Sequence, residues 1–307
     1  MQYLLLLAGF VLLIKGADWF VDGAADAAAR LRIPSVIVGL TIVSLGTSLP
    51  ELSVSLTAAL QGSNALALSK VIGSNLFNTL VVVGCSALIA PFAMSRETRY
   101  RDTTWNLGIT LLLALLAVGH VISRADGCVL LAALVVYLVI LVRSAMASRK
   151  AGAGDPAGST PVWKILLLIA AGVICIALGG DLTVDAARAI ALSWGWSEAL
   201  VGLTIVSIGT SLPELVTSVV AAKKGESGLS IGNALGSNIM NIGFILGLSS
   251  AIHPVAVVPE NMVDIVILSA VALLIVIMSW RSDRLTRRRG WLFIGLYACY
   301  FIYILLR

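Results

Sequence analysis

Two glutamates set in apolar sequence are the residues best suited to do chemistry in this chain. Glu51 and Glu214 each end a Gly-Thr-Ser-Leu-Pro-Glu segment, so hydroxyl groups stand shortly before each carboxylate. Carboxylates, hydroxyls and main-chain carbonyls are hard oxygen donors, the ligands that Ca²⁺ prefers. Neither segment contains Cys or His, which disfavours zinc and copper. The two segments therefore predict a binding site for a hard cation.

Each segment belongs to a longer stretch that occurs twice. Val38–Leu52 and Val201–Leu215 are identical at 14 of 15 positions. Pro50 and Pro213 have no N–H group, and a proline ring within a helix clashes with the carbonyl four residues earlier. We therefore expect each helix to open just before its proline and to free main-chain carbonyls for a cation.

The predicted openings cover residues 44–48 and 207–211. Hydroxyl groups add oxygen donors there, from Thr47, Ser48, Thr210 and Ser211. The alternative interpretation is that each glutamate is a structural polar group, hydrogen-bonded or protonated. Two such glutamates in matching segments favour a bound cation.

A second polar pattern also occurs twice. Ser74 and Asn78 are four residues apart, as are Ser237 and Asn241, so each pair shares one face of a helix. Their oxygens are neutral donors that would complete a coordination shell. Interhelical hydrogen bonding is the alternative role, and the repetition favours ligands.

The composition places these segments in a membrane. Of the 307 residues, 59% are hydrophobic and only 12% are charged, whereas soluble domains have about 25% charged residues. The net charge of +5 does not indicate nucleic-acid binding, because the Lys and Arg residues lie in short loops between apolar runs, as expected of a membrane protein. An uncompensated charge at the bilayer centre costs at least ~2.5–3.5 kcal/mol, so Glu51 and Glu214 need a counter-charge.

Ten apolar runs predict an all-α membrane protein with ten transmembrane helices. Each has the length of about 20 residues that crosses a bilayer. The predicted spans are 2–29, 34–60, 66–90, 103–122, 127–147, 162–192, 198–222, 229–251, 261–280 and 290–306.

The repeat extends beyond the two segments. An offset of 163 aligns residues 16–84 with residues 179–247 without a gap. Each half holds five predicted spans, an odd number, so the second copy must enter the membrane from the opposite side. The sequence therefore predicts two five-helix repeats of inverted topology.

The domain organisation follows from the repeat. We expect an N-terminal repeat over residues 1–147, with its motif at 38–84, and a C-terminal repeat over 161–307, with its motif at 201–247. Residues 148–160, rich in Gly, Ala and Ser, predict a flexible linker between them.

The distribution of basic residues predicts the orientation. The loops after spans 1, 3, 5, 7 and 9, with their flanks, hold 16 of the 21 Lys and Arg residues, and the opposite side holds two. The positive-inside rule places those loops, including the 148–160 linker, in the cytoplasm. We expect a multi-pass protein of the plasma (inner) membrane with both termini on the extracytoplasmic side.

Three smaller features concern helix packing and the charged side chains within the predicted spans. Gly73 and Gly236 predict the close approach of another helix. Lys70, near the outer end of the third span, is expected to extend its ammonium group to the interface. One face of the first span carries Lys15, Asp18 and Asp22, whose opposite charges are placed to pair, and a structural or interfacial role is favoured over a role in guiding ions or holding the sliding helices.

The paired Gly-Thr-Ser-Leu-Pro-Glu and Gly-Ser-Asn segments resemble the α-repeats of the cation/calcium antiporter superfamily, specifically Na⁺/Ca²⁺ exchangers of the prokaryotic type. The resemblance covers nearly the whole chain. It implies a transporter and not an enzyme, with broken helices 2, 3, 7 and 8 forming ion sites at the midplane. It implies no resident cofactor, since Ca²⁺ and Na⁺ are the transported ligands.

The resemblance also implies roles for individual residues. Ca²⁺ would be bound by Glu51 and Glu214 with the carbonyls of Thr47 and Thr210. Na⁺ would be bound by the same glutamates with the hydroxyls of Ser48, Ser211, Ser74 and Ser237 and the carbonyls of Ser44 and Ser207. Asn78 and Asn241 would complete the cluster.

The coupling ion is less strongly specified. K⁺-dependent relatives carry Asp where this chain has Asn241, so Asn78 and Asn241 together predict K⁺ independence. H⁺-coupled relatives usually have Gly-Asn before the acidic residue, where this chain has Gly-Thr-Ser. A Ca²⁺/H⁺ antiporter stays the main alternative, because two buried carboxylates can titrate, and a cation channel is less favoured.

The predicted mechanism is alternating access. Na⁺ moving inward would drive Ca²⁺ outward through the same oxygens, as the two halves rock or slide through spans 1 and 6. The expected partners are Ca²⁺, Na⁺ and the lipid bilayer. Neither nucleic acid nor an obligate protein partner is expected.

Overall fold

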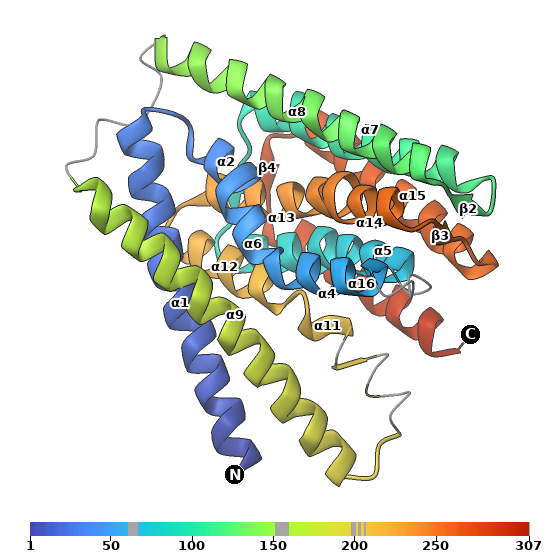
Figure 1. Ribbon diagram of the computed structural model, residues 1–307. Coiled ribbons are helices and arrows are strands. Elements are labelled where there is room, and N and C mark those ends of the chain that lie inside the picture. Colours follow the sequence, from blue (N-terminus) through green and yellow to red (C-terminus); the bar gives the residue numbers. More distant parts are fainter. Residues whose placement is uncertain (61–66, 151–159, 198–200, 202–203, 206, 307) are drawn as a thin grey trace.

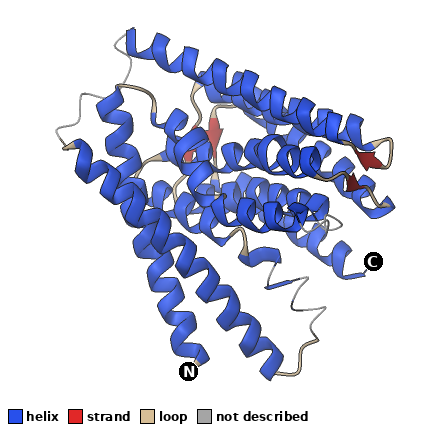
Figure 2. Ribbon diagram, viewed as in Figure 1, coloured by secondary structure: helices blue, strands red, loops and turns tan. Residues whose placement is uncertain are grey.

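The computed structural model describes residues 1–60, 67–150, 160–197, 201, 204–205 and 207–306. Helices make up almost all of this described part, and the few strands are short and lie at the ends of helices (Figures 1 and 2). Some helices contain a wider π-helical turn, labelled η.

The first half of the chain is helical from its second residue onward. Its helices are α1 (Gln2–Leu31), α2 (Ser35–Val38), η1 (Gly39–Val43), α3 (Ser44–Thr47), α4 (Leu49–Leu60), α5 (Ala67–Phe77), η2 (Asn78–Val82), α6 (Val83–Ile89), η3 (Thr98–Asp102), α7 (Thr103–Ala117) and α8 (Arg124–Lys150). Its strands are β1 (Phe92–Ala93) and β2 (Val121–Ile122).

The described elements of the second half repeat much of this order. Its helices are α9 (Val162–Ser193), α11 (Ser207–Gly209), α12 (Leu212–Lys223), α13 (Ser227–Met240), η5 (Asn241–Leu246), α14 (Gly247–Ile252), α15 (Pro259–Arg281) and α16 (Arg287–Leu306). Its strands are β3 (Val255–Ala256) and β4 (Arg284–Leu285).

The helices are those of a multi-pass membrane protein. Within the described residues, seven are long and apolar enough to cross a membrane, or eight if a pair bent by 48° counts as one span. That bent pair joins residues 35–47 to residues 49–57. The expected span 103–122 contains the shorter helix α7, and the expected span 198–222 includes residues outside the described part.

The apolar surface is consistent with a lipid environment. Helices α8 and α9 expose runs of large aliphatic side chains, including Val135, Val136, Leu166 and Leu167. In water such a surface would be a strong aggregation risk, whereas lipid tails solvate it. The core lies inward, around fully buried residues such as Leu76 and Leu235.

Helices α1 and α9, which contain predicted spans 1 and 6, pack side by side along their length (Figure 1). Small residues allow this approach. A Cβ atom placed on Gly16 would lie 2.9 Å from the carbonyl oxygen of Gly172 and 2.7 Å from Cβ of Cys175. The two backbones therefore meet across glycines, as small residues permit between membrane helices.

The strands connect the two halves of the chain. β1 pairs antiparallel with β4, with Phe92 opposite Leu285, and β2 pairs antiparallel with β3, with Ile122 opposite Val255. Each pair therefore holds a loop from the first half against a loop from the second half, which places both loops of a pair at the same end of the bundle.

The boundary of the predicted linker differs in the structure. Helix α8 continues to Lys150, so residues 148–150 are helical and are not part of a flexible segment. Their sequence, Ser-Arg-Lys, contains no helix breaker, so the helix can continue. Residues 151–159 lie outside the described part of the chain, and Thr160 precedes α9.

Candidate ion-binding site

The first polar stretch forms two helices that meet at Ser48. Helix α3 ends at Thr47, and α4 begins at Leu49 with Pro50 as its second residue. Proline is tolerated in the first turn of a helix because the backbone N–H groups there have no intrahelical acceptor, so the missing N–H of proline costs no hydrogen bond. Pro50 therefore marks the start of a new helix, and Glu51 lies in its first turn, where the helix dipole stabilises a negative charge.

The second stretch repeats this arrangement. Thr210 and Ser211 lie between α11 and α12, and Pro213 and Glu214 fall in the first turn of α12. The backbone at Ser211 (φ −102°, ψ 8°) is close to that at Ser48 (φ −86°, ψ 3°). Each half of the chain thus presents one glutamate at the N-terminus of a half-helix.

The first opening is narrower than the sequence predicts. Ser44 to Thr47 stay helical, and only Ser48 lies between helices. The Ser44 carbonyl accepts hydrogen bonds from the Ser48 N–H (3.1 Å) and the Thr47 hydroxyl (3.3 Å). Side-chain bonds to the preceding turn, such as Ser44 Oγ to the Leu40 carbonyl (2.9 Å), hold this segment in a helical conformation.

The asparagines of the second pattern begin π-helical turns. η2 begins at Asn78 and η5 begins at Asn241, the positions that the repeat aligns. Single π-turns inside α-helices are frequent at functional sites. Both asparagine side chains are almost completely buried.

Hydrogen bonds bring the predicted residues of the two halves together. Ser48 Oγ donates to Glu214 Oε1 (3.0 Å) and contacts Ser237 Oγ (3.3 Å). Ser74 Oγ donates to Glu51 Oε1 (3.1 Å) and accepts from Ser211 Oγ (3.1 Å). Asn241 Nδ2 donates to the same Ser74 oxygen (3.1 Å). The cluster is therefore built jointly by α4, α5, α12, α13 and the adjoining turns.

Four buried oxygens in this cluster make no hydrogen bond in the described structure. They are Glu51 Oε2, Glu214 Oε2, Asn78 Oδ1 and Asn241 Oδ1. Leaving a buried polar group unpaired costs about 1–3 kcal/mol, and more when it is charged. Two carboxylate and two amide oxygens form a donor set that fits Ca²⁺ or Na⁺.

The predicted ligands differ in burial, and the side chain of one of them lies outside the described part of the chain. Thr47, Ser48, Ser211 and Ser237 are buried, whereas Thr210 is only partly buried. Ser207 is the first residue of α11, and its side chain lies outside the described part.

The network includes polar residues outside the set of predicted ligands. Asn241 Nδ2 also donates to Asn75 Oδ1 (3.0 Å), whose own Nδ2 donates to the Asn238 carbonyl (3.1 Å). Asn238 Nδ2 in turn donates to Thr79 Oγ1 (2.7 Å). Asn75 and Asn238 occupy aligned positions in the two Gly-Ser-Asn segments, so the repeat held the signal that identifies them.

Asn233 is a further residue of this kind. Its Oδ1 accepts from Thr47 Oγ1 (3.1 Å), and its Nδ2 donates to the Glu214 carbonyl (3.2 Å). An amide at this point links the broken helix of one half to the glutamate of the other. A polar residue in an otherwise apolar run was the only sign of it in the sequence.

Two smaller predictions need correction. Gly236 does permit close approach, with Ser44 Oγ at 2.7 Å from a placed Cβ, but no atom of the described residues lies within 4 Å of a Cβ on Gly73. Lys70 does not extend to the interface, because its Nζ donates to the Glu51 carbonyl (3.5 Å).

The charges of the first span take part in packing between helices, in agreement with the structural or interfacial role favoured for them. Asp18 and Asp22 each pair with Lys224 of α12, at 2.7 Å, and not with Lys15 of their own helix. Packing of α12 against α1 brings the Lys224 ammonium between the two carboxylates. The ion pairs therefore join two helices and do not lie within one.

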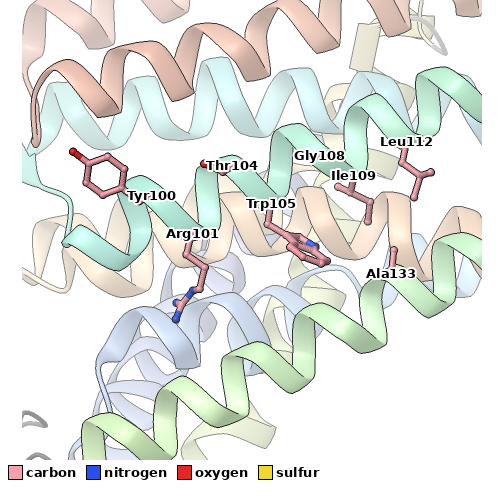
Figure 3. Close-up of a pocket in the computed structure, with 8 residues that line it drawn as sticks. All are labelled: Tyr100, Arg101, Thr104, Trp105, Gly108, Ile109, Leu112 and Ala133. Carbon is pink, nitrogen blue, oxygen red and sulfur yellow. The ribbon is translucent and has the colours of Figure 1, made fainter.

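A groove on another part of the protein lies between α7 and α8 (Figure 3). Its lining is mainly apolar and aromatic, from Tyr100, Arg101, Thr104, Trp105, Gly108, Ile109, Leu112 and Ala133. Arg101 is held there by Asp102 (2.7 Å) and by Ser144 (2.6 Å). The groove has no carboxylate in its lining and is separate from the Glu51 and Glu214 cluster.

Comparison with known proteins identifies the family. A family model described as sodium/calcium exchanger protein matches residues 1–143 and 164–306. The putative antiporter CaxA of Alkalimonas amylolytica is 38% identical over 292 residues, covering 92% of this chain and 90% of that protein. The sodium/calcium exchanger MaX1 of Methanosarcina acetivorans is 27% identical over 326 residues, covering 92% and 93%.

A solved structure has the same fold. The sodium-calcium exchanger NCX_Mj, soaked with 2.5 mM Na⁺ and 0.1 mM Ca²⁺, matches with a TM-score of 0.86 and 32% identity, over 97% of this chain and 96% of that one. The likeness therefore extends over nearly all of both chains, including both halves of the buried oxygen cluster. This chain belongs to the sodium/calcium exchanger protein family, within the cation/calcium antiporter superfamily.

Proposed function

We propose that this protein is a secondary antiporter that exchanges Na⁺ for Ca²⁺ across the membrane by alternating access. One observation carries the proposal: four buried oxygens of the predicted ligands, two from each half of the chain, have no hydrogen-bond partner among the described residues and belong to residues aligned by the repeat. Two of these oxygens belong to carboxylates, whose burial demands a positive counter-charge. A divalent cation meets that demand with a single ion.

The proposed ligands follow the two halves symmetrically. Ca²⁺ is bound by Glu51 and Glu214 together with the carbonyls of Thr47 and Thr210. Na⁺ is bound by the same glutamates with the hydroxyls of Ser48, Ser211, Ser74 and Ser237 and the carbonyls of Ser44 and Ser207, while Asn78 and Asn241 complete the shell. Ser74 already donates to Glu51 and accepts two bonds, so ion binding there requires a change of its hydrogen bonds.

The proposed architecture is ten transmembrane helices in two inverted repeats, over residues 1–147 and 161–307 with a linker between them. Helices 2, 3, 7 and 8 form the ion site. The family model also matches in two parts, 1–143 and 164–306. The aligned π-turns at Asn78 and Asn241 support the repeat.

Exchange follows from competition for the same carboxylates. Either Ca²⁺ or Na⁺ neutralises Glu51 and Glu214, whereas an empty site leaves buried charge that opposes movement of the unloaded protein. The glycine-lined contact between α1 and α9 lets these two helices slide as one unit past the cluster. A single ion site thereby opens to the two sides in turn.

The orientation and the coupling ion belong to the same proposal. The basic loops face the cytoplasm, both termini face outward, and the protein resides in the plasma (inner) membrane. The pairing of β1 with β4 supports placing the loops after spans 3 and 9 on one side. Asparagine at both 78 and 241 makes the exchange independent of K⁺.

Flux measurements in proteoliposomes test the proposal. Purified protein is reconstituted, and uptake of radiolabelled Ca²⁺ is followed while the Na⁺ and H⁺ gradients are varied independently, with and without K⁺. We expect an outward Na⁺ gradient at clamped pH to drive uptake, and we expect K⁺ to have no effect. The Glu214→Gln variant in the same vesicles serves as the inactive control.

Other patterns of flux would contradict specific parts of this proposal. Uptake that follows the pH gradient and ignores Na⁺ would make the protein a Ca²⁺/H⁺ antiporter. Ca²⁺ conductance without any counter-ion would make it a channel. Uptake that requires K⁺ would disprove the role given to Asn241.

A further inference from the structure

The two asparagines that the repeat aligns in the ion cluster, Asn78 and Asn241, are held differently. Asn241 Nδ2 donates to Ser74 Oγ (3.1 Å) and to Asn75 Oδ1 (3.0 Å), so both of its N–H groups are used. Its Oδ1 is buried without a hydrogen-bond partner among the described residues, and the same is true of both polar atoms of Asn78. Hydrogen bonds therefore orient the amide of Asn241, and none in the described part orients that of Asn78.

The orientation of an amide decides whether it can bind a cation. An asparagine side chain carries an acceptor oxygen and a donor NH₂ group of similar shape, and the two exchange places when the amide turns over. Only the oxygen is a ligand for Ca²⁺ or Na⁺. The neighbours that take up the N–H groups of Asn241 therefore determine that its oxygen stays available.

Ser74 supplies one of these constraints. Its hydroxyl proton is donated to Glu51 Oε1 (3.1 Å), so towards Asn241 it can only accept, and it requires the NH₂ side of the amide. Ser74 is also a proposed Na⁺ ligand, and its hydrogen bonds must change when an ion binds there. A second constraint is needed to keep Asn241 oriented throughout the transport cycle.

Asn75 supplies a constraint that does not involve a proposed ligand on its other side. It is almost completely buried, and its Nδ2 donates to the main-chain carbonyl of Asn238 (3.1 Å). A carbonyl only accepts, so Asn75 must turn its NH₂ group towards α13 and its Oδ1 away from that carbonyl. This Oδ1 accepts from Asn241 (3.0 Å). The main chain of α13 thus orients Asn75, and Asn75 orients Asn241.

The first half of the chain lacks this arrangement. Asn238 occupies the position aligned with Asn75, but its Nδ2 donates to Thr79 Oγ1 (2.7 Å), and its Oδ1 has no partner in the described structure. The repeat aligns Thr79 with Ile242, which has no hydroxyl group. The competing partner therefore exists in one half alone, and Asn238 makes no hydrogen bond to Asn78 within the described residues.

We propose that Asn75 is a positioning residue of the ion site, which holds Asn241 with its amide oxygen available to the cation and is not itself a ligand. This inference rests on the proposed function, because it takes Asn241 to be a ligand. It makes the two aligned asparagines unequal: Asn241 is oriented before the ion arrives, whereas Asn78 takes up its orientation when the ion binds.

The Asn75→Ala variant tests this role, because it removes the acceptor without adding bulk. Ca²⁺ affinity is measured by calorimetric titration of the full-length protein in detergent. Loss of a group that orients a metal ligand typically lowers metal affinity by 10- to 100-fold, so we expect a loss of at least about tenfold. Asn75→Ser, whose hydroxyl is too short to replace the amide oxygen, should lose affinity in the same way and provides a second variant if the first is unstable.

Asn238→Ala is the matched control, since it makes the same change at the aligned position. It removes a buried amide and its bond to Thr79 but no contact with Asn241, and we expect its Ca²⁺ affinity to stay close to the wild-type value. Gel filtration and thermal unfolding check that the variants are folded. Equal losses of affinity in Asn75→Ala and Asn238→Ala would overturn the proposal.

A double-mutant cycle separates positioning from a general structural effect. If Asn75 acts through Asn241, its substitution should matter only while Asn241 is present. We expect Asn75→Ala to lower Ca²⁺ affinity by about tenfold or more in the wild-type background and by less than about twofold in the Asn241→Ala background. Additive losses would show that Asn75 does not act through Asn241.

The binding measurement keeps this inference distinguishable from the exchange proposal. If the wild-type protein binds Ca²⁺ but shows no Na⁺-driven uptake in proteoliposomes, the exchange proposal fails, and a non-additive cycle still supports the role of Asn75. If uptake follows the Na⁺ gradient and the cycle is additive, the exchange proposal stands and the positioning role is disproved.

Discussion

Ser48 of the first half of the chain donates a hydrogen bond of 3.0 Å to the carboxylate of Glu214 in the second half. The donor lies at the junction between α3 and α4, and the acceptor lies in the first turn of α12. The Glu214 carboxylate is therefore oriented by a residue of the other half, and the buried polar cluster is built by both halves together.

Removal of this contact should weaken ion binding. A hydrogen bond to a charged group contributes about 1.5–3 kcal/mol, and 1.4 kcal/mol corresponds to tenfold in affinity, so Ser48→Ala should lower Ca²⁺ affinity by roughly 10- to 100-fold. Calorimetric titration of detergent-purified protein with Ca²⁺ measures this affinity. Ser53→Ala, at an exposed position on α4, is the matched control. Equal affinities in the two variants would contradict the role of Ser48.

Loss of either buried carboxylate should abolish exchange. Glu51→Gln and Glu214→Gln keep the size of the side chain but leave a bound divalent ion with one uncompensated charge. A charge at that depth costs at least ~2.5–3.5 kcal/mol, so Na⁺-driven Ca²⁺ uptake should fall by on the order of 100-fold or more. Glu97→Gln, at an exposed position just before η3, should retain normal uptake. Gel filtration checks that the variants are folded, and wild-type flux in either would disprove the site.

The repeat aligns Gly73 with Gly236, but their surroundings differ, so alanine substitution should affect stability unequally at the two positions. A Cβ on Gly236 would lie 2.7 Å from Ser44 Oγ and 2.8 Å from Leu40 Cα, so Gly236→Ala should destabilise the protein by about 1–3 kcal/mol through overpacking. Among the described residues, no atom lies within 4 Å of a Cβ on Gly73. Gly73→Ala should therefore be neutral, or stabilising by up to about 1 kcal/mol through helix propensity.

Thermal unfolding in detergent, followed by a thiol-reactive dye, compares these two variants. The chain has four free cysteines for the dye. A melting temperature that falls equally in both variants would contradict the close approach of α13 to η1 and α3 as the cause.

The ion pairs of Lys224 predict a pH-dependent contribution to stability. Partial burial lowers the pKa of Lys224, but its bonds to Asp18 and Asp22 outweigh this, and the pKa rises above its ordinary value of 10.5. The pairs therefore stabilise the folded protein fully below pH 10.5, and this contribution is lost as the pH rises through the folded-state pKa. Exposed ion pairs of this kind contribute about 1 kcal/mol or less.

Lys224→Met isolates this contribution. The difference in melting temperature between wild type and variant should be small and constant between about pH 6 and 9, and it should shrink only in more alkaline solution. A difference that grows with rising pH in the alkaline range would contradict the assigned pairing. Lys223→Met, which removes the neighbouring charge, controls for the change in net charge.

The sequence by itself determined the class of protein, and it predicted most of the polar residues that the structure brings together in the buried cluster. Apolar runs of membrane-spanning length are local properties, and they remain visible however the helices pack. The duplicated Gly-Thr-Ser-Leu-Pro-Glu segment carried Glu51 and Glu214, because an acidic group in such a run needs compensation. Its oxygen-only donors indicated a hard cation before any contact was known.

Only the tertiary structure decided how those residues are held and what surrounds them. Asn233 and Lys70 stand at aligned positions, yet their different roles depend on which carbonyls and hydroxyls of other helices reach them. The same is true of Lys224, which is 202 residues from Asp22 in sequence and 2.7 Å from it in space. The local sequence pattern of a helix does not determine which other helix packs against it or in which register. Both depend on packing between segments that are far apart in the chain.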